Sequence, residues 1–210
     1  MKRIYIEINT IKHQNFYVSN DLISFECSEN MRDAKISLNP GVIEQNATIV
    51  IYDRDNNFKN ASIYNTEDIF KGATVAIHAT ETVNNEFLDE ILGTYLISEI
   101  KFDGDSETVT LNCSDITSQL NNVVVNEYPL EQRNAHQLLD IVFNDFLNGA
   151  FWQYMSTEVE NICKNTIVPN SYMNNTNARE ILDMVCGLCM LTIYCKNNVF
   201  YVGFCVWVII

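Results

Sequence analysis

Basic residues are scarce in this sequence. Its 210 residues include 13 Lys and Arg against 27 Asp and Glu, which gives a formal charge of −14. A protein that wraps nucleic acid needs clustered Lys and Arg to displace counterions from the phosphates, and anionic membrane surfaces attract the same side chains. The composition therefore disfavours both kinds of partner. It suits a soluble protein, or a subunit that meets a more basic neighbour.

Glycine, export signals and long apolar runs are also lacking. The chain has 7 Gly, and they form no Gly-rich phosphate loop. The opening residues, MKRIYIEINTIKH, are followed by no apolar stretch or cleavage site, so we expect no signal peptide. The longest apolar run, VFYVGFCVWVII at residues 199–210, is too short to span a bilayer, so we expect no membrane span. Such an apolar chain end indicates a buried strand, a surface that packs on a partner, or an abrupt stop in a longer reading frame.

Histidine is too sparse and cysteine too irregular to indicate a metal or redox centre. The three His are scattered, at residues 13, 78 and 136, and seven Cys lie at residues 27, 113, 163, 186, 189, 195 and 205. The pair Cys186-Gly-Leu-Cys189 falls at the predicted C-terminal end of a helix, whereas a redox pair needs a helix N-terminus. A zinc site would need a second such pair or two His. We predict seven free thiols and no cofactor, and metal or redox work is the less favoured alternative.

No group of residues predicts catalysis. Asp53, Asp55 and Asn57 have the spacing of a calcium loop, but Phe58 and Tyr64 replace its Gly and its bidentate Glu, so a solvated turn is the better interpretation. His78 lies in an alternating strand, and His136 forms an i,i+4 pair with Asp140, both of which suit ordinary polar positions. A nucleophilic thiol, Cys163 or Cys113 paired with a His, stays open as the least favoured hypothesis.

What the sequence does contain is a large apolar fraction, 47%, with 10 Tyr and 11 Phe, which predicts a globular protein. Up to about residue 113 the apolar residues alternate in short runs separated by polar turns. One pair of runs is joined by Asp103-Gly104-Asp105 and predicts a hairpin. The predicted strands are RIYIEI, LISFEC, AKISL, ATIVIYD, ATVAIHAT, TYLISEI and ETVTLNC.

Beyond residue 114 the apolar spacing becomes helical. The stretches NAHQLLDIVFNDFL and NTNAREILDMVCGLCM each begin at an Asn suited to capping, Asn134 and Asn177, and Glu180 completes an approximate capping box. The segment LTIYCKNNVFYVGF then predicts a hairpin across residues 196–198. We therefore predict an α+β, β-dominated fold, with a β-barrel-like or sandwich domain at 1–120 and a mixed helix and hairpin domain at 121–210.

The order of these pieces resembles the hub and tail-tip proteins of tailed bacteriophages. In those proteins a tail-tube-like β-barrel carries an F-x-G-x-x-V strand and then a G-x-Y-x-V-x-E hairpin that runs into a C/A-x-D helix start. The resemblance covers roughly residues 20–204 and rests on the order of short motifs, with Ile97 in place of the usual Val. The matching residues are Phe70, Gly72, Val75, Gly93, Tyr95, Glu99, Cys113 and Asp115.

The resemblance implies a structural subunit of a phage tail tip or baseplate hub, or of a phage-derived injection device. Such a protein forms an oligomeric ring around the tail channel, is assembled in the host cytoplasm and resides in the virion tail. Its partners are copies of itself and other tail proteins, and DNA is only passing cargo. A full hub continues through a second barrel, so the second domain is expected to be incomplete at Ile210.

Two alternatives remain. A carbohydrate-binding or receptor-binding module of a phage tail would need Tyr and Trp on one exposed face, whereas Trp152 and Trp207 lie in apolar surroundings. A Cys-dependent hydrolase would need an activated thiol. Whether the protein is a hub subunit or a receptor-binding module of a tail, the apolar end of the chain predicts a contact with a neighbour. The residues expected in that interface are Phe204, Val206, Trp207, Val208, Ile209 and Ile210.

Overall fold

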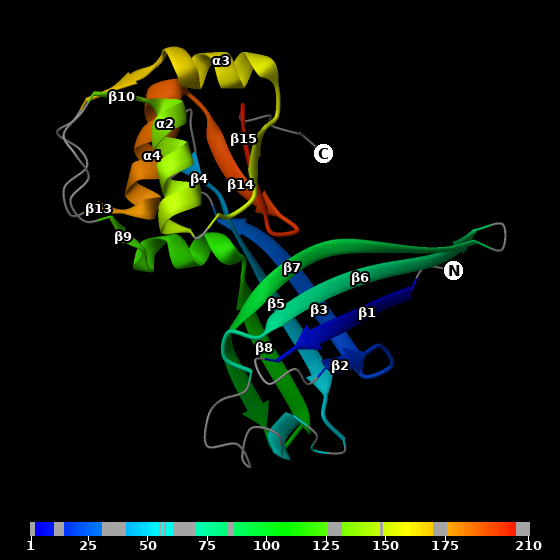
Figure 1. Ribbon diagram of the computed structural model, residues 1–210. Coiled ribbons are helices and arrows are strands. Elements are labelled where there is room, and N and C mark those ends of the chain that lie inside the picture. Colours follow the sequence, from blue (N-terminus) through cyan, green and yellow to red (C-terminus); the bar gives the residue numbers. More distant parts are fainter. Residues whose placement is uncertain are drawn as a thin grey trace. The chain divides into compact units, whose positions relative to one another are not determined.

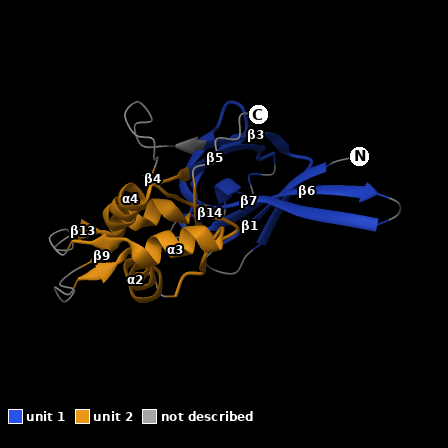
Figure 2. Ribbon diagram, turned by 90° about the horizontal axis from the view of Figure 1, so that it is seen from above, with its two compact units in different colours: residues 1–28, 45–115 blue, residues 29–44, 116–210 orange. Residues whose placement is uncertain are grey.

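The chain folds into two compact units, shown in separate colours in Figure 2. The computed structural model describes residues 3–10, 15–30, 41–54, 56, 58–60, 70–83, 86–125, 132–147, 149–169 and 176–204. Residues 1–28 and 45–115 form one unit, here called the β unit. Residues 29–44 and 116–210 form the other, here called the mixed unit. The chain therefore leaves the β unit once, contributes to the mixed unit, and returns before leaving for good.

The β unit is one seven-stranded sheet with the strand order β2-β1-β6-β7-β8-β5-β3 (Figure 1). Among the described residues the outer strands β2 and β3 do not pair with each other, so the sheet is open and no closed barrel is found. The predicted α+β, β-dominated class is confirmed. The strands are β1 (Arg3–Asn9), β2 (Asn15–Val18), β3 (Leu22–Asn30), β5 (Glu44–Tyr52), β6 (Thr74–Val83), β7 (Glu86–Asp103) and β8 (Thr108–Ser114).

Two-residue alternation builds the core of the β unit. One face of the sheet carries fully buried aliphatic side chains from five strands, including Ile6, Ile49, Ile77, Ile97 and Leu111. The predicted hairpin between β7 and β8 is confirmed. Its turn is held by the carboxylate of Asp103, which accepts hydrogen bonds from the amide of Asp105 at 3.0 Å and the hydroxyl of Ser106 at 2.7 Å.

The mixed unit packs helices against a four-stranded sheet with the order β11-β15-β14-β4. Its helices are η1 (Ile116–Asn122, a 3-10 helix), α2 (Ala135–Asp140), the π-helical η2 (Ile141–Phe146), α3 (Thr157–Asn165) and α4 (Ala178–Cys189). The sheet strands are β4 (Gly41–Val42), β11 (Trp152–Tyr154), β14 (Thr192–Lys196) and β15 (Val199–Gly203). Two short ribbons pair β10 (Arg133–Asn134) with β12 (Ile167–Val168), and β13 (Thr176–Asn177) with β9 (Val124–Val125).

The predicted helix starts and the second predicted hairpin are confirmed. Asn134 and Asn177 each accept a hydrogen bond from the backbone amide three residues on, at 2.9 Å, and each is part of a complete capping box. The hairpin of β14 and β15 turns at Asn197 and Asn198, whose φ angles are 52° and 61°. Asn tolerates this left-handed conformation better than most residues, which suits a two-residue turn.

Strand β4 joins the mixed unit through a buried arginine. It pairs in parallel with β14, and Gly41 there has a φ of +70°. The guanidinium of Arg179, a side chain of α4 that is only 5% exposed, donates to the carbonyl of Val42 at 2.8 Å and to the carboxylate of Glu44 at 3.2 Å. The carboxylate of Asp183 accepts from the amide of Val42 at 2.8 Å. No pattern in the sequence predicted this two-residue strand, and the predicted strand AKISL next to it lies outside the described residues.

Candidate assembly surface

The last part of β6 and the first part of β7 form a two-stranded arm, which Figure 1 shows projecting beyond the neighbouring strands. Strand β1 pairs with β6 only as far as Thr80, and β8 pairs with β7 only from Leu96 onward. We call residues 78–83 and 86–92 the arm. Among the described residues, the neighbouring strands β1 and β8 therefore do not extend along the outer part of this hairpin.

The arm exposes large apolar side chains on both of its faces. Phe87 is 70% exposed and Leu88 is 52% exposed. Successive residues of a strand point to opposite faces, so Phe87 and Ile91 share one face while Leu88 lies on the other with Val83. Ile91, Leu92 and Val83 are each about two-fifths exposed. Contiguous exposed apolar residues rimmed by polar ones mark surfaces that bind other molecules.

The same arm carries only negative charge. No Lys or Arg occurs in residues 72–100, whereas the arm holds Glu81, Glu86, Asp89 and Glu90. Such a surface fits a partner that offers apolar side chains together with positive or neutral polar groups.

A polar cluster fixes the base of the arm to β1. The ring of Tyr5 stacks on that of His78 with centroids 4.3 Å apart, next to an irregularity in the register between Ile77 and His78. The hydroxyl of Tyr5 donates to the carboxylate of Asp89 at 2.8 Å, and Nδ1 of His78 lies 3.0 Å from the same carboxylate. Burial and the bond to Asp89 raise the pKa of Tyr5 to about 12. Thus His78 is a buried residue with its own partners, as its strand position predicted.

Most of the residues matched to the tail-protein motifs lie inside the β unit. Phe70, Val75, Tyr95, Cys113 and Asp115 are buried. Burial and a hydrogen bond with Cys27 raise the pKa of Tyr95 above its usual range. These five positions form the interior of the unit, and they do not gather into a cleft.

The two motif glycines have clear geometric reasons. Gly72 has a φ of +77° and donates its amide to the carbonyl of Ile97 at 2.9 Å, which ties the turn before β6 to β7. At Gly93 a Cβ atom would come within 2.6 Å of the ring of Tyr95. The remaining motif residue, Glu99, is exposed and accepts hydrogen bonds from Asn112 and Lys101, both at 2.8 Å.

Neither thiol considered as a nucleophile is activated. Burial raises the pKa of Cys113 to about 12. A hydrogen bond with Cys189, together with burial, raises the pKa of Cys163, which is fully buried. The hydroxyl of Tyr154 hydrogen-bonds both to Cys163 and to Nδ1 of His136, the latter at 2.8 Å, so the histidine contacts a phenol. A thiolate is what attacks a carbonyl, and this arrangement disfavours one.

The predicted interface at the apolar end of the chain is described only in part. Residues 199–203 form strand β15, in which Phe200 and Val202 are buried, so the start of this run belongs to the core of the mixed unit. Phe204 follows the strand and is 40% exposed. The other residues of the predicted interface lie outside the described residues.

Of the three residues with the spacing of a calcium loop, Asp53 is described, and it forms part of a turn. Both carboxylate oxygens of Asp53 accept backbone amides, from Phe58 at 3.1 Å and from Lys59 at 3.0 Å. Asp55 and Asn57 are not among the described residues. Within the part of the chain that the structure describes, no group of three or more His, Cys, Asp or Glu is placed to hold a metal ion. The helices among those residues are all too short or too polar to cross a bilayer.

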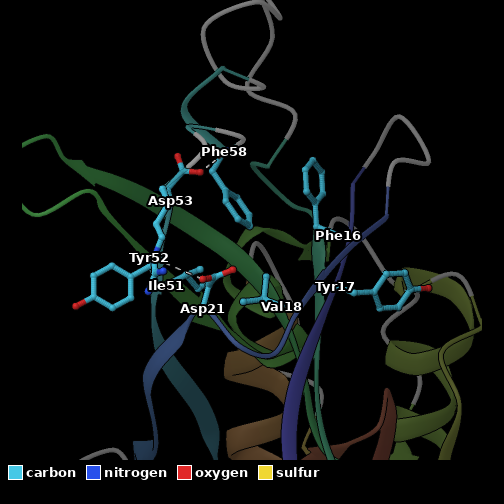
Figure 3. A pocket seen from close by; sticks show the side chains of 9 residues that line it. Phe16, Tyr17, Val18, Asp21, Ile51, Tyr52, Asp53 and Phe58 are labelled. Atoms are coloured by element: carbon cyan, nitrogen blue, oxygen red, sulfur yellow. Dashed lines mark hydrogen bonds and ion pairs between the residues drawn. The ribbon is translucent and has the colours of Figure 1, made fainter.

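A hollow of about 490 Å³ opens beside Asp53 in the β unit (Figure 3). The rings of Phe16 and Phe58 lie on one side of it, with centroids 5.3 Å apart. Its charged groups are engaged with one another or with the backbone, because Arg54 lies 3.9 Å from Asp21 and Asp53 holds the two amides. We assign this hollow no function.

The fold is that of phage tail proteins. Three solved structures are similar over nearly the whole chain: a prophage tail protein from Listeria monocytogenes (10% identity, TM-score 0.63), a tail protein from Neisseria meningitidis (8%, 0.60) and a prophage tail protein from Shewanella oneidensis (13%, 0.57). These matches cover 95%, 96% and 97% of this chain. The chain spans about half of each of those proteins, at 50%, 50% and 53%. No known protein-family profile and no curated protein matches the sequence. The resemblance inferred from the sequence motifs is therefore confirmed at the level of the fold.

Proposed function

We propose that the protein is a structural subunit of a phage tail tip or baseplate hub, or of a phage-derived injection device, and that it forms an oligomeric ring around the tail channel. The observation that carries the proposal is the arm, with Phe87 and Leu88 exposed on opposite faces. Apolar side chains exposed on both faces of a hairpin are unfavourable in water. Contact with one neighbouring subunit on each face would bury them. The fold of the chain supports the same conclusion.

The edges of the β unit offer further contacts for such a ring. Among the described strands, β2 and β3 each have one side without a strand partner. Free strand edges pair readily with other chains. On β3 the side chain of Ile23 is 44% exposed, and on β2 that of Tyr17 is 66% exposed. Assembly through edges and apolar side chains needs no catalytic group, and the buried thiols fit a protein that is not an enzyme.

The net charge suits the proposed place in the particle. We propose that the subunit is assembled in the host cytoplasm and resides in the virion tail, with copies of itself and other tail proteins as partners. DNA then passes as cargo, because a formal charge of −14 offers its phosphates little to hold.

Light scattering coupled to size-exclusion chromatography tests the proposal. The wild type is expected to elute as a concentration-dependent oligomer, whereas Phe87→Ser combined with Leu88→Ser is expected to be a folded monomer. Phe151→Ser removes an aromatic side chain that is 79% exposed in the mixed unit, and serves as a matched control that leaves the oligomer intact. A wild-type protein that stays monomeric at high concentration, with native circular dichroism, contradicts the proposal.

A further inference from the structure

The mixed unit contains a second hollow, of about 510 Å³, that the assembly role does not use. The start of α2 contributes His136, strand β11 contributes residues 152–154, and the start of α3 contributes Thr157 and Glu160. The volume lies within the range of about 300–1,000 Å³ that is typical of small-molecule sites.

One wall of this hollow is a set of aromatic rings with fixed positions. The indole of Trp152 stacks on the ring of Phe143 at 5.3 Å and 24°, and Phe143 is fully buried. The ring of Tyr154 meets Trp152 edge-on at 5.0 Å and 78°. Because Phe143 supports the indole of Trp152, little side-chain entropy is lost when a ligand packs on that ring. Trp152 and Tyr154 are both half-buried against the core of the mixed unit, and the part of each ring that stays accessible lines this hollow.

The rim of the hollow is polar, and its charges are compensated in pairs. Glu160 accepts from the ammonium of Lys164 at 2.6 Å, and the lining residue His136 has its Nε2 3.4 Å from Asp140, which lies behind it and does not line the hollow. The carboxylate of Glu160 disfavours an anionic ligand, and its pairing with Lys164 leaves little net charge to attract a cation. A wholly apolar ligand would cover polar side chains without replacing their hydrogen bonds to water.

We infer that this hollow binds a neutral saccharide unit. The apolar face of a sugar ring would lie against Trp152 and Tyr154, and its hydroxyls would hydrogen-bond with the exposed side chain of Thr157 and with the carboxylate of Glu160. The inference does not depend on the proposed place of the protein in a ring, because every residue that carries it belongs to the mixed unit.

Tryptophan fluorescence and saturation-transfer NMR on the full chain test the inference. The chain has 2 Trp, so Trp207→Phe leaves Trp152 as the only indole reporter. The probes are glucose, galactose, mannose, N-acetylglucosamine and their disaccharides, with sialic acid as an anionic probe and choline as a cationic one. We expect at least one neutral sugar to change the emission saturably.

Variants locate the binding. Thr157→Ala, at an exposed position, is expected to weaken saccharide binding about tenfold, as the loss of one hydrogen bond would. The control is Asn144→Ala, at an exposed position of the same unit, and it should leave binding unchanged. Gln137 is unsuitable as a control position because it belongs to a capping box. Binding that is absent for every neutral sugar, that favours sialic acid or choline, or that ignores the rim variant overturns the inference. Loss of sugar binding with an intact oligomer would separate this site from the assembly role.

Discussion

Three buried cysteines of this protein have raised thiol pKa values, whereas a hydrogen bond with Cys163 lowers the pKa of the buried Cys189. Cys113, Cys163 and Cys186 are buried with raised thiol pKa values, whereas Cys27 is exposed. A raised pKa means less thiolate near pH 8 and slower alkylation. We expect brief treatment of the native protein with iodoacetamide to label Cys27 and to spare the three buried thiols, as peptide mapping would measure.

The unfolded protein provides the reference for that experiment. Under denaturing, non-reducing conditions a thiol titration should approach seven, the number of Cys in the chain. Cys27→Ser should remove the fast-labelled peptide and leave the others unchanged. Rapid native labelling of Cys163 would show that its environment is more open than described, and stoichiometric zinc would refute the prediction of free thiols.

Adding a single methyl group at Gly93 should lower the unfolding free energy of the β unit. A Cβ there would lie within 2.6 Å of the buried ring of Tyr95, so Gly93→Ala must displace that ring. Overpacking of this kind costs about 1–3 kcal/mol of unfolding free energy, which urea denaturation can measure. Gly104→Ala is the matched control, since no atom lies within 4 Å of a Cβ at that turn position. Equal stability of the two variants would contradict the prediction.

At the scale of elements, the helix caps are the clearest link between sequence and structure. Asn177 accepts the amide of Glu180 at the start of α4, so Asn177→Ala should lower the unfolding free energy by about 0.5–2 kcal/mol. Thermal unfolding followed by circular dichroism measures the change. Asn144→Ala makes the same substitution at an exposed position within η2 and should be close to neutral. A neutral Asn177→Ala would mean that packing alone holds the start of α4.

Elements encoded by neighbouring residues could be predicted from the sequence. The turn at Asp103 and the helix starts at Asn134 and Asn177 depend on hydrogen bonds that span two or three residues, so their patterns are local. The i,i+4 pair of His136 and Asp140 is local too, and the structure places these side chains 3.4 Å apart.

Elements that depend on distant partners could not be predicted in the same way. Strand β4 has two residues, and its pairing with β14 and its bonds to Arg179 come from more than 130 residues away. In the sequence, the only sign of the buried charge network beside β4 is Arg179, an arginine on the apolar face of a predicted helix. Likewise, the projection of the arm depends on where the described parts of β1 and β8 end, which the residues of the arm do not encode.

At the scale of the molecule, the two units have separate cores. One core is built around Ile6, Ile77 and Leu111, and the other around Phe143, Leu182 and Phe200. Separate cores predict unfolding that is not two-state. Calorimetry is expected to show two transitions, one for each unit.

Substitutions should assign those transitions. Arg179→Met leaves the carboxylates of Glu44 and Asp183 without their buried partner, which costs about 3–5 kcal/mol and should lower only the transition of the mixed unit. Gly93→Ala should lower only the transition of the β unit. A single transition that both variants shift equally would show that the units unfold together.

The position of β4 in the sequence also determines when each unit can mature on the ribosome. Gly41 and its partner Thr192 are 151 residues apart, so at about 5–20 residues per second the segment 29–44 waits roughly 8–30 s for β14 to be synthesised. The strands of the β unit are complete at Ser114, long before that moment. A nascent chain would therefore present a finished arm while the mixed unit still lacks its last strands. The proposed contacts between subunits through the arm could then begin on the polysome, before either chain is released.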